Sequence, residues 1–461
     1  RPTCPPTGWT KAALDKHRVL LLDQRGTGRS SPVTTKQLQA LPGGAEEQAE
    51  FLTHFRADSI VRDCEIVRER IAGGKKLSLL GQSFGGFCIL TYLSLFPDAI
   101  ERALVTFGLA PVGHMADEVY TATFKRMEER NRRYYRRYPE DVEHVRRIVA
   151  ALHDAPVMLP RGGTLTARRF LQLGLLLGSA SGFEALHELL DLAREGPAED
   201  VSTAAAAVEL PDHFLLAVEN AQQDFETNPI YWLLHEAIYV DGASGVGARG
   251  DGVADNGPHG APSAWAAERT QAALGEAWDY STRLTAGSQP VQLTGEMVFS
   301  WMGDDYAWLR PLKPAAELLA SKPDWGLLYD TDALGKGSAP VAALVSYEDV
   351  YVERSFSEDA AALLGDRAQL WITVCGCSQP LRVAIARGCQ CSVPCGACLL
   401  CLHTPLSGCS YVCTHHSLTA SYVCTHHSLA VSHVCTRHSL AVSLVCTRHS
   451  LTGVRLGFAT E

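Results

Sequence analysis

The sequence predicts an α/β protein built on a doubly wound, mostly parallel sheet, and three observations support this prediction. Residues 17–23 (HRVLLLD) form a short apolar run that ends in a glycine-rich loop, as a buried strand does. Residues 46–73 then place apolar side chains at helical spacing and end at two glycines. The apolar runs 77–80 and 103–107 predict two more strands, and residues 84–96 predict a helix between them. Strands that alternate with helices are typical of parallel sheets.

A long helical block interrupts this alternation. From residue 117 to 280 the pattern is helical and lacks strand signals. Within it, the charged run 126–137 is typical of a solvated helix face, and the Gly- and Ala-rich segment 241–263 predicts a loop. Strand signals then return, with one helix between two strands, in residues 340–347, 357–364 and 370–374. Helices inserted between the strands of one sheet predict a cap that covers the sheet.

The composition of the 461 residues argues against several classes of function. The net charge is −10 at pH 7, whereas nucleic-acid binding needs a basic face. No apolar run reaches the roughly 18 residues of a membrane-spanning helix. Only three cysteines precede residue 375, which is typical of a reduced protein inside the cell, so we expect a cytoplasmic location. Because the chain starts with Arg1 rather than methionine, we also expect an N-terminally truncated sequence.

The composition changes abruptly at Cys375. The other twelve cysteines lie between Cys375 and Cys446, and the last four of them recur at intervals of 11 residues in units like SYVCTHHSLTA. These units are rich in Cys, Ser, Thr and β-branched residues, which are poor helix formers. We therefore predict that residues 375–461 form no stable fold. Because cysteine and histidine bind zinc and copper, a metal site around residues 395–401 is the alternative.

The most specific motif is GQSFGG, residues 81–86, which joins a predicted strand to a predicted helix. G-x-S-x-G in this context is the nucleophile elbow of the α/β hydrolases, a tight turn that lifts the serine hydroxyl above the sheet. The sequence therefore predicts that Ser83 is a catalytic nucleophile. The backbone N–H of Phe84 lies at the start of the following helix, where it can bind a developing oxyanion.

Longer stretches of the chain resemble one family of peptidases. LLLDQRGTGRSSP and LLGQSFGGFCILTYLSLFP are similar to segments of the prolyl aminopeptidase (proline iminopeptidase) family, and NPIYWLLHEAIY, LTGEMVFSWM and VSYEDVYVERSFS resemble its longer-chain branch. The resemblance covers roughly residues 1–373. It implies an α/β-hydrolase fold with an inserted helical cap and an enzyme that releases N-terminal proline from peptides. It also implies a Ser–Asp–His triad that needs no cofactor.

The resemblance divides the chain into four parts. It implies a first part of the hydrolase core over residues 1–115, a helical cap over 116–288 and a second part of the core over 289–374. The Cys- and His-rich tail over 375–461 lies beyond it. The sequence leaves the oligomeric state open.

The resemblance also assigns roles to individual residues. Ser83 is the nucleophile, and Asp349, in a loop after a late strand, is the triad acid, with its neighbour Glu348 as the rival. Family members recognise the free amino terminus of the substrate with acidic side chains of the cap. Glu236 and Glu296 are the candidates, because each is an isolated acid in an apolar or aromatic stretch.

Two parts of the family pattern are missing. The chain has no HGGPG-like segment before the DQRGTGRS loop, which would supply the second oxyanion donor. It also has no histidine between His259 and His403, whereas the family carries the triad base shortly after the last strand. One of the tail histidines, such as His403, could replace it. Two other functions therefore stay open: a hydrolase-fold protein that only binds peptide amino termini, and another serine hydrolase such as an esterase.

Overall fold

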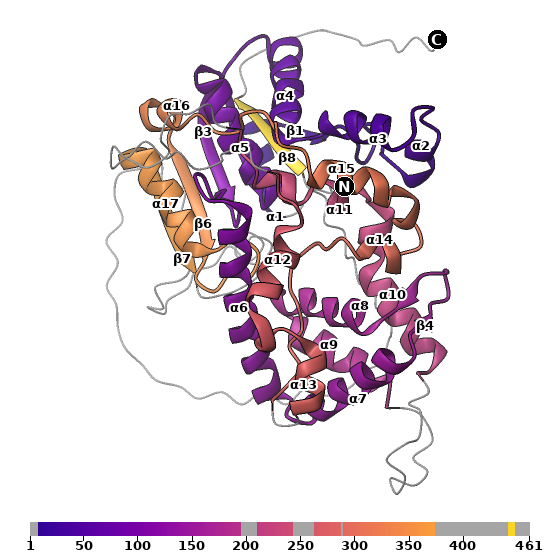
Figure 1. The fold of residues 1–461 in the computed structure, drawn as a ribbon. Coiled ribbons are helices and arrows are strands. Elements are labelled where there is room, and N and C mark those ends of the chain that lie inside the picture. Colours follow the sequence, from indigo (N-terminus) through magenta and orange to yellow (C-terminus); the bar gives the residue numbers. More distant parts are fainter. Residues whose placement is uncertain (1–7, 195–209, 243–261, 287–288, 374–440, 448–461) are drawn as a thin grey trace, which may run out of the picture.

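A six-stranded sheet forms the centre of the computed structural model, which describes residues 8–194, 210–242, 262–286, 289–373 and 441–447 (Figure 1). The strand order is β1-β8-β2-β3-β6-β7. The strands are β1 His17–Asp23, β2 Leu77–Gln82, β3 Ile100–Thr106, β6 Val341–Ser346, β7 Ala368–Thr373 and β8 Ala441–Thr447. β2, β3, β6 and β7 are parallel, whereas β8 runs antiparallel to both of its neighbours. The parallel α/β class predicted from the sequence is confirmed.

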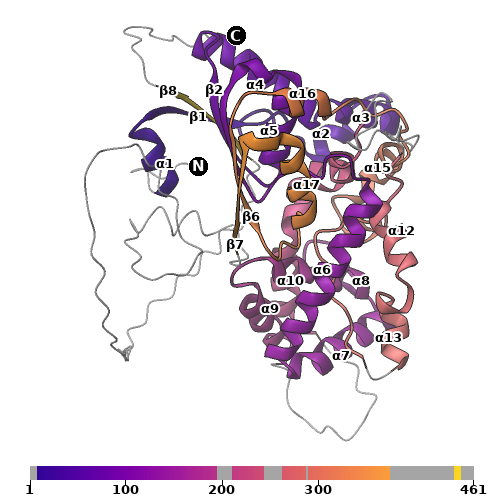
Figure 2. The same ribbon diagram turned by 90° about the vertical axis from the view of Figure 1, so that its left-hand side faces the viewer.

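The two faces of the sheet are covered unequally. Figure 2 shows α4 (Ala57–Ala72), α5 (Phe84–Leu95), α16 (Thr331–Lys336) and α17 (Arg354–Leu364) on one side of the sheet and α1 (Gly8–Leu14) on the other. The register places Leu79, Ala103 and Ala343 on the side of α5, and Leu79 and its neighbours there are buried. On the opposite face Leu104 and Trp371 are 37% and 45% exposed. Among the described helices, only α1 covers that second face.

The helices that accompany the first strands lie before residue 100. They are α1 Gly8–Leu14, α2 Thr35–Gln39, α3 Gly44–Thr53, α4 Ala57–Ala72, α5 Phe84–Leu95 and the 3₁₀ turn η1 Pro97–Ala99. The single helix predicted over residues 46–73 is two helices. The chain breaks at Arg56, whose backbone is extended and whose buried guanidinium donates to the carbonyls of Val240 and Gly326 at 3.0 and 2.6 Å. This tertiary contact overrides the local helical pattern.

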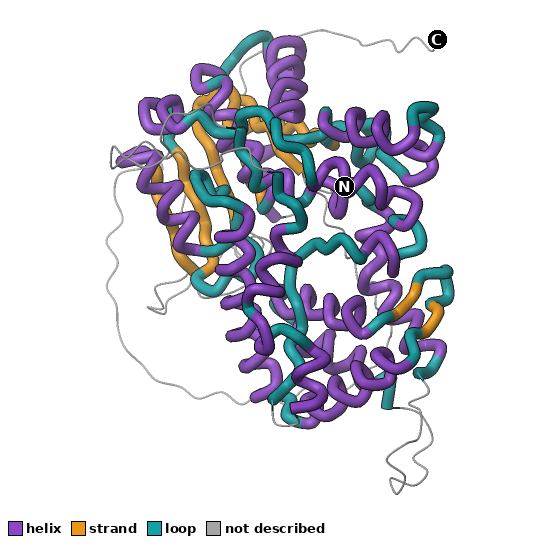
Figure 3. The backbone as a smooth tube through the Cα atoms, in the orientation of Figure 1, coloured by secondary structure: helices purple, strands orange, loops and turns teal. Residues whose placement is uncertain are grey.

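Between β3 and β6 the chain forms mostly helices. Most of them lie together beyond one end of the sheet, whereas the last, α16, packs against α5 on one face of the sheet (Figures 1 and 3). The first group is α6 Ala116–Arg137, α7 Glu140–Asp154, α8 Ala167–Leu171, η2 Gln172–Gly178, α9 Gly182–Asp191 and α10 Asp212–Thr227. The second group is α11 Ile230–Leu234, η3 Glu236–Ile238, α12 Ala266–Ala273, η4 Gly275–Ala277, α13 Tyr280–Ala286, α14 Met302–Asp305, η5 Arg310–Leu312, α15 Lys313–Ala320 and α16 Thr331–Lys336. The sequence predicts no strands here, but Val157–Met158 (β4) and Thr164–Leu165 (β5) form a short antiparallel pair.

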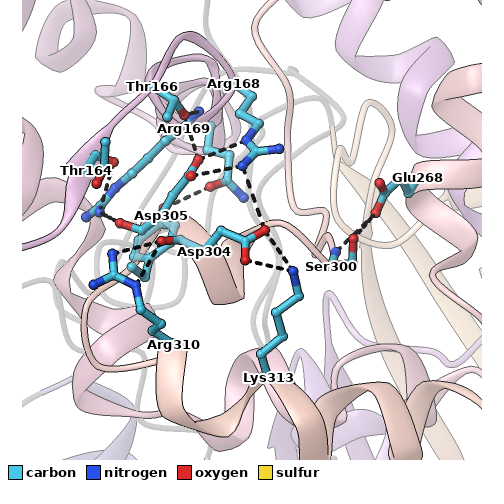
Figure 4. Close-up of polar contacts among 12 residues, drawn as sticks. Thr164, Thr166, Arg168, Arg169, Glu268, Ser300, Asp304, Asp305, Arg310 and Lys313 are labelled. Atoms are coloured by element: carbon cyan, nitrogen blue, oxygen red, sulfur yellow. Dashed lines mark hydrogen bonds and ion pairs between the residues drawn. The ribbon is translucent and has the colours of Figure 1, made fainter. Parts of the chain in front are cut away.

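A polar network holds this helical region together (Figure 4). Asp305, at the end of α14, is 3% exposed. Both of its carboxylate oxygens accept hydrogen bonds, from the Thr166 hydroxyl at 2.6 Å and from the Arg168 guanidinium at 2.9 and 3.0 Å. Its backbone carbonyl accepts from the fully buried Arg169 at 2.7 Å. These bonds tie α8 to α14 across about 140 residues of sequence.

Helix α17 (Arg354–Leu364) and the turn η6 (Gly365–Arg367) connect β6 to β7. Among the described residues every helix is too short or too polar to cross a lipid bilayer. Cys64 and Cys88 are buried free thiols. Both lie on helices that cover the sheet, so packing accounts for them.

One segment of the cysteine-rich tail is described. Residues 441–447 form β8, whose seven residues lie between β1 and β2, although the sequence predicts no stable fold for residues 375–461. Their β-branched residues disfavour a helix but favour an extended strand that has neighbours on both sides. The rest of the tail, its metal-site alternative at 395–401 and most of the loop predicted over 241–263 lie outside the described residues.

Candidate active site

Ser83 occupies a strained turn between β2 and α5. Its backbone has φ 52° and ψ −126°, a conformation that non-glycine residues rarely adopt. The turn is held by hydrogen bonds from Ser83 N–H to the Thr106 carbonyl at 3.0 Å and from Gly86 N–H to the Ser83 carbonyl at 2.7 Å. A β-carbon on Gly81 would lie 2.4 Å from the Gly85 carbonyl oxygen, and one on Gly86 would lie 2.2 Å from that of Gly108. The glycines of the motif therefore serve close backbone packing around the serine.

Ser83 and Phe84 line a small cavity of about 80 Å³. The hydrolase core contributes the β1 loop and the Ser83 turn to its walls, and the helical region contributes α11, η3 and the segment before α14. The remaining lining residues are Gln24, Thr27, Phe55, Arg56, Phe87, Asn228, Ile230, Tyr231, Leu234, His235, Ile238, Tyr239, Glu296 and Val352. A pocket of this size, lined mainly by apolar and aromatic side chains, suits a small ring or a single amino-acid residue.

Asp349 follows β6 and is 7% exposed. Its Oδ1 accepts hydrogen bonds from the backbone N–H groups of Tyr351 and Val352, at 2.8 and 3.0 Å. Burial nevertheless raises the pKa of this carboxyl to about 6. Val352, one of its two donors, lines the Ser83 pocket.

Glu348 lies in a different environment. Its carboxylate accepts hydrogen bonds from the Arg133 guanidinium on α6 at 2.5 and 2.7 Å, and this contact lowers its pKa. It therefore serves to fix the β6 loop to α6. The two neighbouring acids thus face opposite surroundings, and only Asp349 is enclosed by the protein.

Glu296 lines the pocket opposite the core. It lies deep in the protein, with part of its side chain open to the pocket, and the Tyr231 hydroxyl donates a hydrogen bond to its Oε1. Burial raises the pKa of this carboxyl to about 7, and the nearby charge of Asp349 acts in the same direction. Glu296 is therefore an acid that a cationic ligand would readily keep ionised.

Glu236 is not among the residues that line the pocket. Its carboxylate is buried and accepts a hydrogen bond from the backbone N–H of Ala267, at the start of α12, at 3.1 Å. Burial raises its pKa. The structure thus brings Ser83, Phe84 and Glu296 to one cavity, with Asp349 close to it, and directs Glu236 towards α12.

One residue of the pocket, His235, is not among the site residues predicted from the sequence. His235 lines the pocket between Tyr231 and Tyr239, with ring centroids 5.1 and 5.7 Å away. These three residues recur at intervals of four, so they share one face of a helical segment, whereas Glu236 projects from another face. This spacing was the signal that could have identified His235 from the sequence.

The aromatic side chains near the pocket divide into two groups. Tyr231 and Tyr239 line the cavity. Trp232 instead donates its indole N–H to the Phe299 carbonyl at 2.9 Å, and Trp301 stacks on the Phe299 ring. These two tryptophans belong to the core of the helical region.

Comparisons with known proteins agree with this geometry. The alpha/beta hydrolase fold family matches residues 6–149. The proline iminopeptidase of Aeromonas sobria is 43% identical over 366 residues, which cover 79% of this chain and 77% of that protein. The chain belongs to the proline iminopeptidase family. The proline iminopeptidase aneH of Aspergillus aculeatus is 36% identical over 75% of this chain and 70% of its own length. A tripeptidyl aminopeptidase of Streptomyces lividans is 35% identical over only 69 residues.

The resemblance to the proline iminopeptidase family implies a histidine base shortly after the last strand of the sheet. The sequence that follows β7 contains no histidine before His403. This segment lies outside the described residues from residue 374 onward. Among the described residues, no group of three His, Cys, Asp or Glu side chains could hold a metal ion.

Proposed function

We propose that this chain is a serine aminopeptidase of the proline iminopeptidase family that releases N-terminal proline from peptides. The observation that carries the proposal is the pairing of Ser83 with Glu296 on one small, largely apolar cavity. An enzyme that removes a single N-terminal residue needs a nucleophile and an amine-binding group separated by one residue of substrate. The aromatic side chains that line the cavity, among them Phe84, Tyr231 and Tyr239, can pack against a pyrrolidine ring.

In this proposal Ser83 attacks the carbonyl carbon of the N-terminal proline. The proton of the hydroxyl passes to a histidine, the peptide nitrogen leaves with that proton, and water then hydrolyses the prolyl ester on Ser83. The N–H of Phe84 donates to the developing oxyanion. Asp349 keeps one oxygen free of its two backbone bonds and would orient the imidazole and stabilise the imidazolium.

The substrate's ammonium group would pair with Glu296. An ionised carboxylate in an apolar cavity needs a cationic partner. Burial raises the pKa of Glu296, and no basic side chain in the described part of the chain forms an ion pair with it. We favour Glu296 over Glu236 for this role because Glu236 is bonded to the start of α12. Glu236 would then act from behind the pocket by holding α12 in place.

The absence of histidine between His259 and His403 favours a second candidate function. Unless an imidazole accepts the proton of the Ser83 hydroxyl, the serine stays a weak nucleophile at neutral pH. The chain would then bind peptide amino termini in the same cavity without cleaving them.

Labelling with a fluorophosphonate probe, together with hydrolysis of a prolyl anilide, separates the two candidates. We expect the wild-type protein to be labelled and to release proline. Ser83→Ala should lose the label and roughly 10⁴-fold or more of the rate. A wild-type protein that binds prolinamide but resists the probe would support the binding function instead. Retained turnover in Ser83→Ala would exclude Ser83 as the nucleophile.

A further inference from the structure

His235 has a buried ring nitrogen that forms no hydrogen bond with the described residues. The side chain is 7% exposed and lines the Ser83 pocket. Its Nε2 has no hydrogen-bond partner among the described residues. Buried polar groups are nearly always paired, so an unpaired nitrogen on a side chain that lines a cavity points to a ligand in that cavity.

The surroundings of His235 narrow the chemistry of that ligand. Its ring lies 5.1 Å from the ring of Tyr231, whose hydroxyl donates to Glu296. His235 and Glu296 therefore both contact Tyr231, one through its ring and the other through its hydroxyl, and all three residues line the same pocket. Burial lowers the pKa of His235 to about 4, so the imidazole is neutral at pH 7 and one ring nitrogen is an acceptor.

We propose that His235 is a specificity residue that accepts a hydrogen bond through Nε2 from the free amino group of the substrate, beside Glu296. This inference rests on the proposed aminopeptidase function. The ammonium of an N-terminal proline carries two N–H donors. The Glu296 carboxylate takes one of them and the His235 nitrogen takes the other, so that neither donor is buried unpaired.

Two acceptors on one amine also determine what the pocket rejects. A peptide with an acylated N terminus has no ammonium and would leave both acceptors unpaired in an apolar cavity. A neutral imidazole adds an acceptor without adding a second negative charge next to Glu296 and Asp349. His235 thereby raises selectivity for free amino termini at a lower desolvation cost than a further carboxylate would have.

The test compares two ligands that differ at one atom. L-Prolinamide has the ring amine, and (S)-tetrahydrofuran-2-carboxamide has an ether oxygen in its place. Their affinities for the full chain are measured by calorimetry at pH 7, which does not depend on turnover. We expect the wild type to bind prolinamide more tightly. In His235→Phe, which keeps a flat ring but has no acceptor, prolinamide should weaken roughly tenfold or more while the ether is little affected.

A second variant guards against a purely structural effect. His235→Gln can place an amide oxygen near the position of Nε2 and should recover most of the preference for the amine. If His235→Phe weakens both ligands equally, or keeps the wild-type preference, the inference is wrong while the pocket assignment stands. If the wild type shows no preference for prolinamide, the amine site itself is wrong, and the proposed function fails with it.

Discussion

Two buried polar regions of the molecule differ in how their carboxylates are paired. In the network around Asp305, both carboxylate oxygens accept hydrogen bonds, and Arg169 donates to the Asp305 carbonyl and to Gln222 (Figure 4). The guanidinium of Arg169 also lies 3.7 Å from the centroid of the Tyr306 ring. These contacts hold the helical cap together, although the second terminal nitrogen of Arg169, Nη2, has no hydrogen-bond partner among the described residues.

The pocket beside Ser83 shows the opposite condition. Gln24 and His235 each line it with a buried side-chain atom that has no partner among the described residues. Burial also raises the pKa of Glu296 to about 7. Unsatisfied groups cost stability, and a ligand in the pocket can supply the missing partners. An ion pair to the buried carboxylate therefore distinguishes the Asp305 network from the candidate site, where no described basic side chain pairs with Glu296.

Removing Asp305 should have the largest effect on stability. Asp305→Ala leaves the Arg168 guanidinium and the Thr166 hydroxyl without their acceptor, and we expect the free energy of unfolding to fall by about 3 kcal/mol. Urea denaturation followed by circular dichroism measures this change. Asp304→Ala is the matched control, because Asp304 is half-exposed and pairs with Lys313; it should cost less than about 1 kcal/mol. Similar losses in both variants would mean that burial of the network is unimportant.

Removing the charge of Glu296 should instead increase the free energy of unfolding. The pKa of Glu296 is raised from 4.5 to about 7, so the unfolded chain ionises first, and the native state loses stability as pH rises between these values. Glu296→Gln should therefore stabilise the protein by about 2 kcal/mol at pH 8 and change little at pH 4.5. Urea unfolding at the two pH values tests this. A gain that does not depend on pH would show that another property of the residue is responsible.

The same substitution should weaken ligand binding. Prolinamide should lose affinity for Glu296→Gln at pH 8, where the wild-type carboxylate is ionised. Stabilisation together with weaker binding is the outcome that marks Glu296 as a ligand-binding group and not as part of the scaffold.

The smallest effect should come from Tyr231. Its hydroxyl stabilises the ionised form of Glu296, so Tyr231→Phe should raise the pKa of Glu296 further, by about one pH unit. The pH at which prolinamide affinity is half lost would move upward accordingly. Tyr306→Phe, which removes a hydroxyl bonded to Gln172 elsewhere, serves as the control and should leave that pH unchanged. An unchanged midpoint in Tyr231→Phe would show that the hydrogen bond does not control this carboxyl.

Features of the fold that depend on short stretches of chain could be predicted from the residues alone. The strand-to-helix turn at Ser83 requires glycines at fixed positions because backbone segments are in contact there. The motif can therefore be recognised from the sequence without a structure. The apolar runs of β2, β3 and β6 could be predicted for the same reason, since strands buried in a parallel sheet have few alternatives. β1 was also predicted as a buried strand, but it lies at the edge of the described sheet and none of its residues is buried.

The surroundings of the four candidate acids, in contrast, depend on contacts between distant parts of the chain. Asp349 and Glu348 are adjacent in the chain, yet Arg133, from more than 200 residues away, engages just one of them. Glu236 and Glu296 look alike as isolated acids, but the rotation of one helical segment turns Glu236 towards α12 and His235 towards the cavity. Burial and partners come from packing between distant segments, and these fix both the charge of a side chain and the space that it faces.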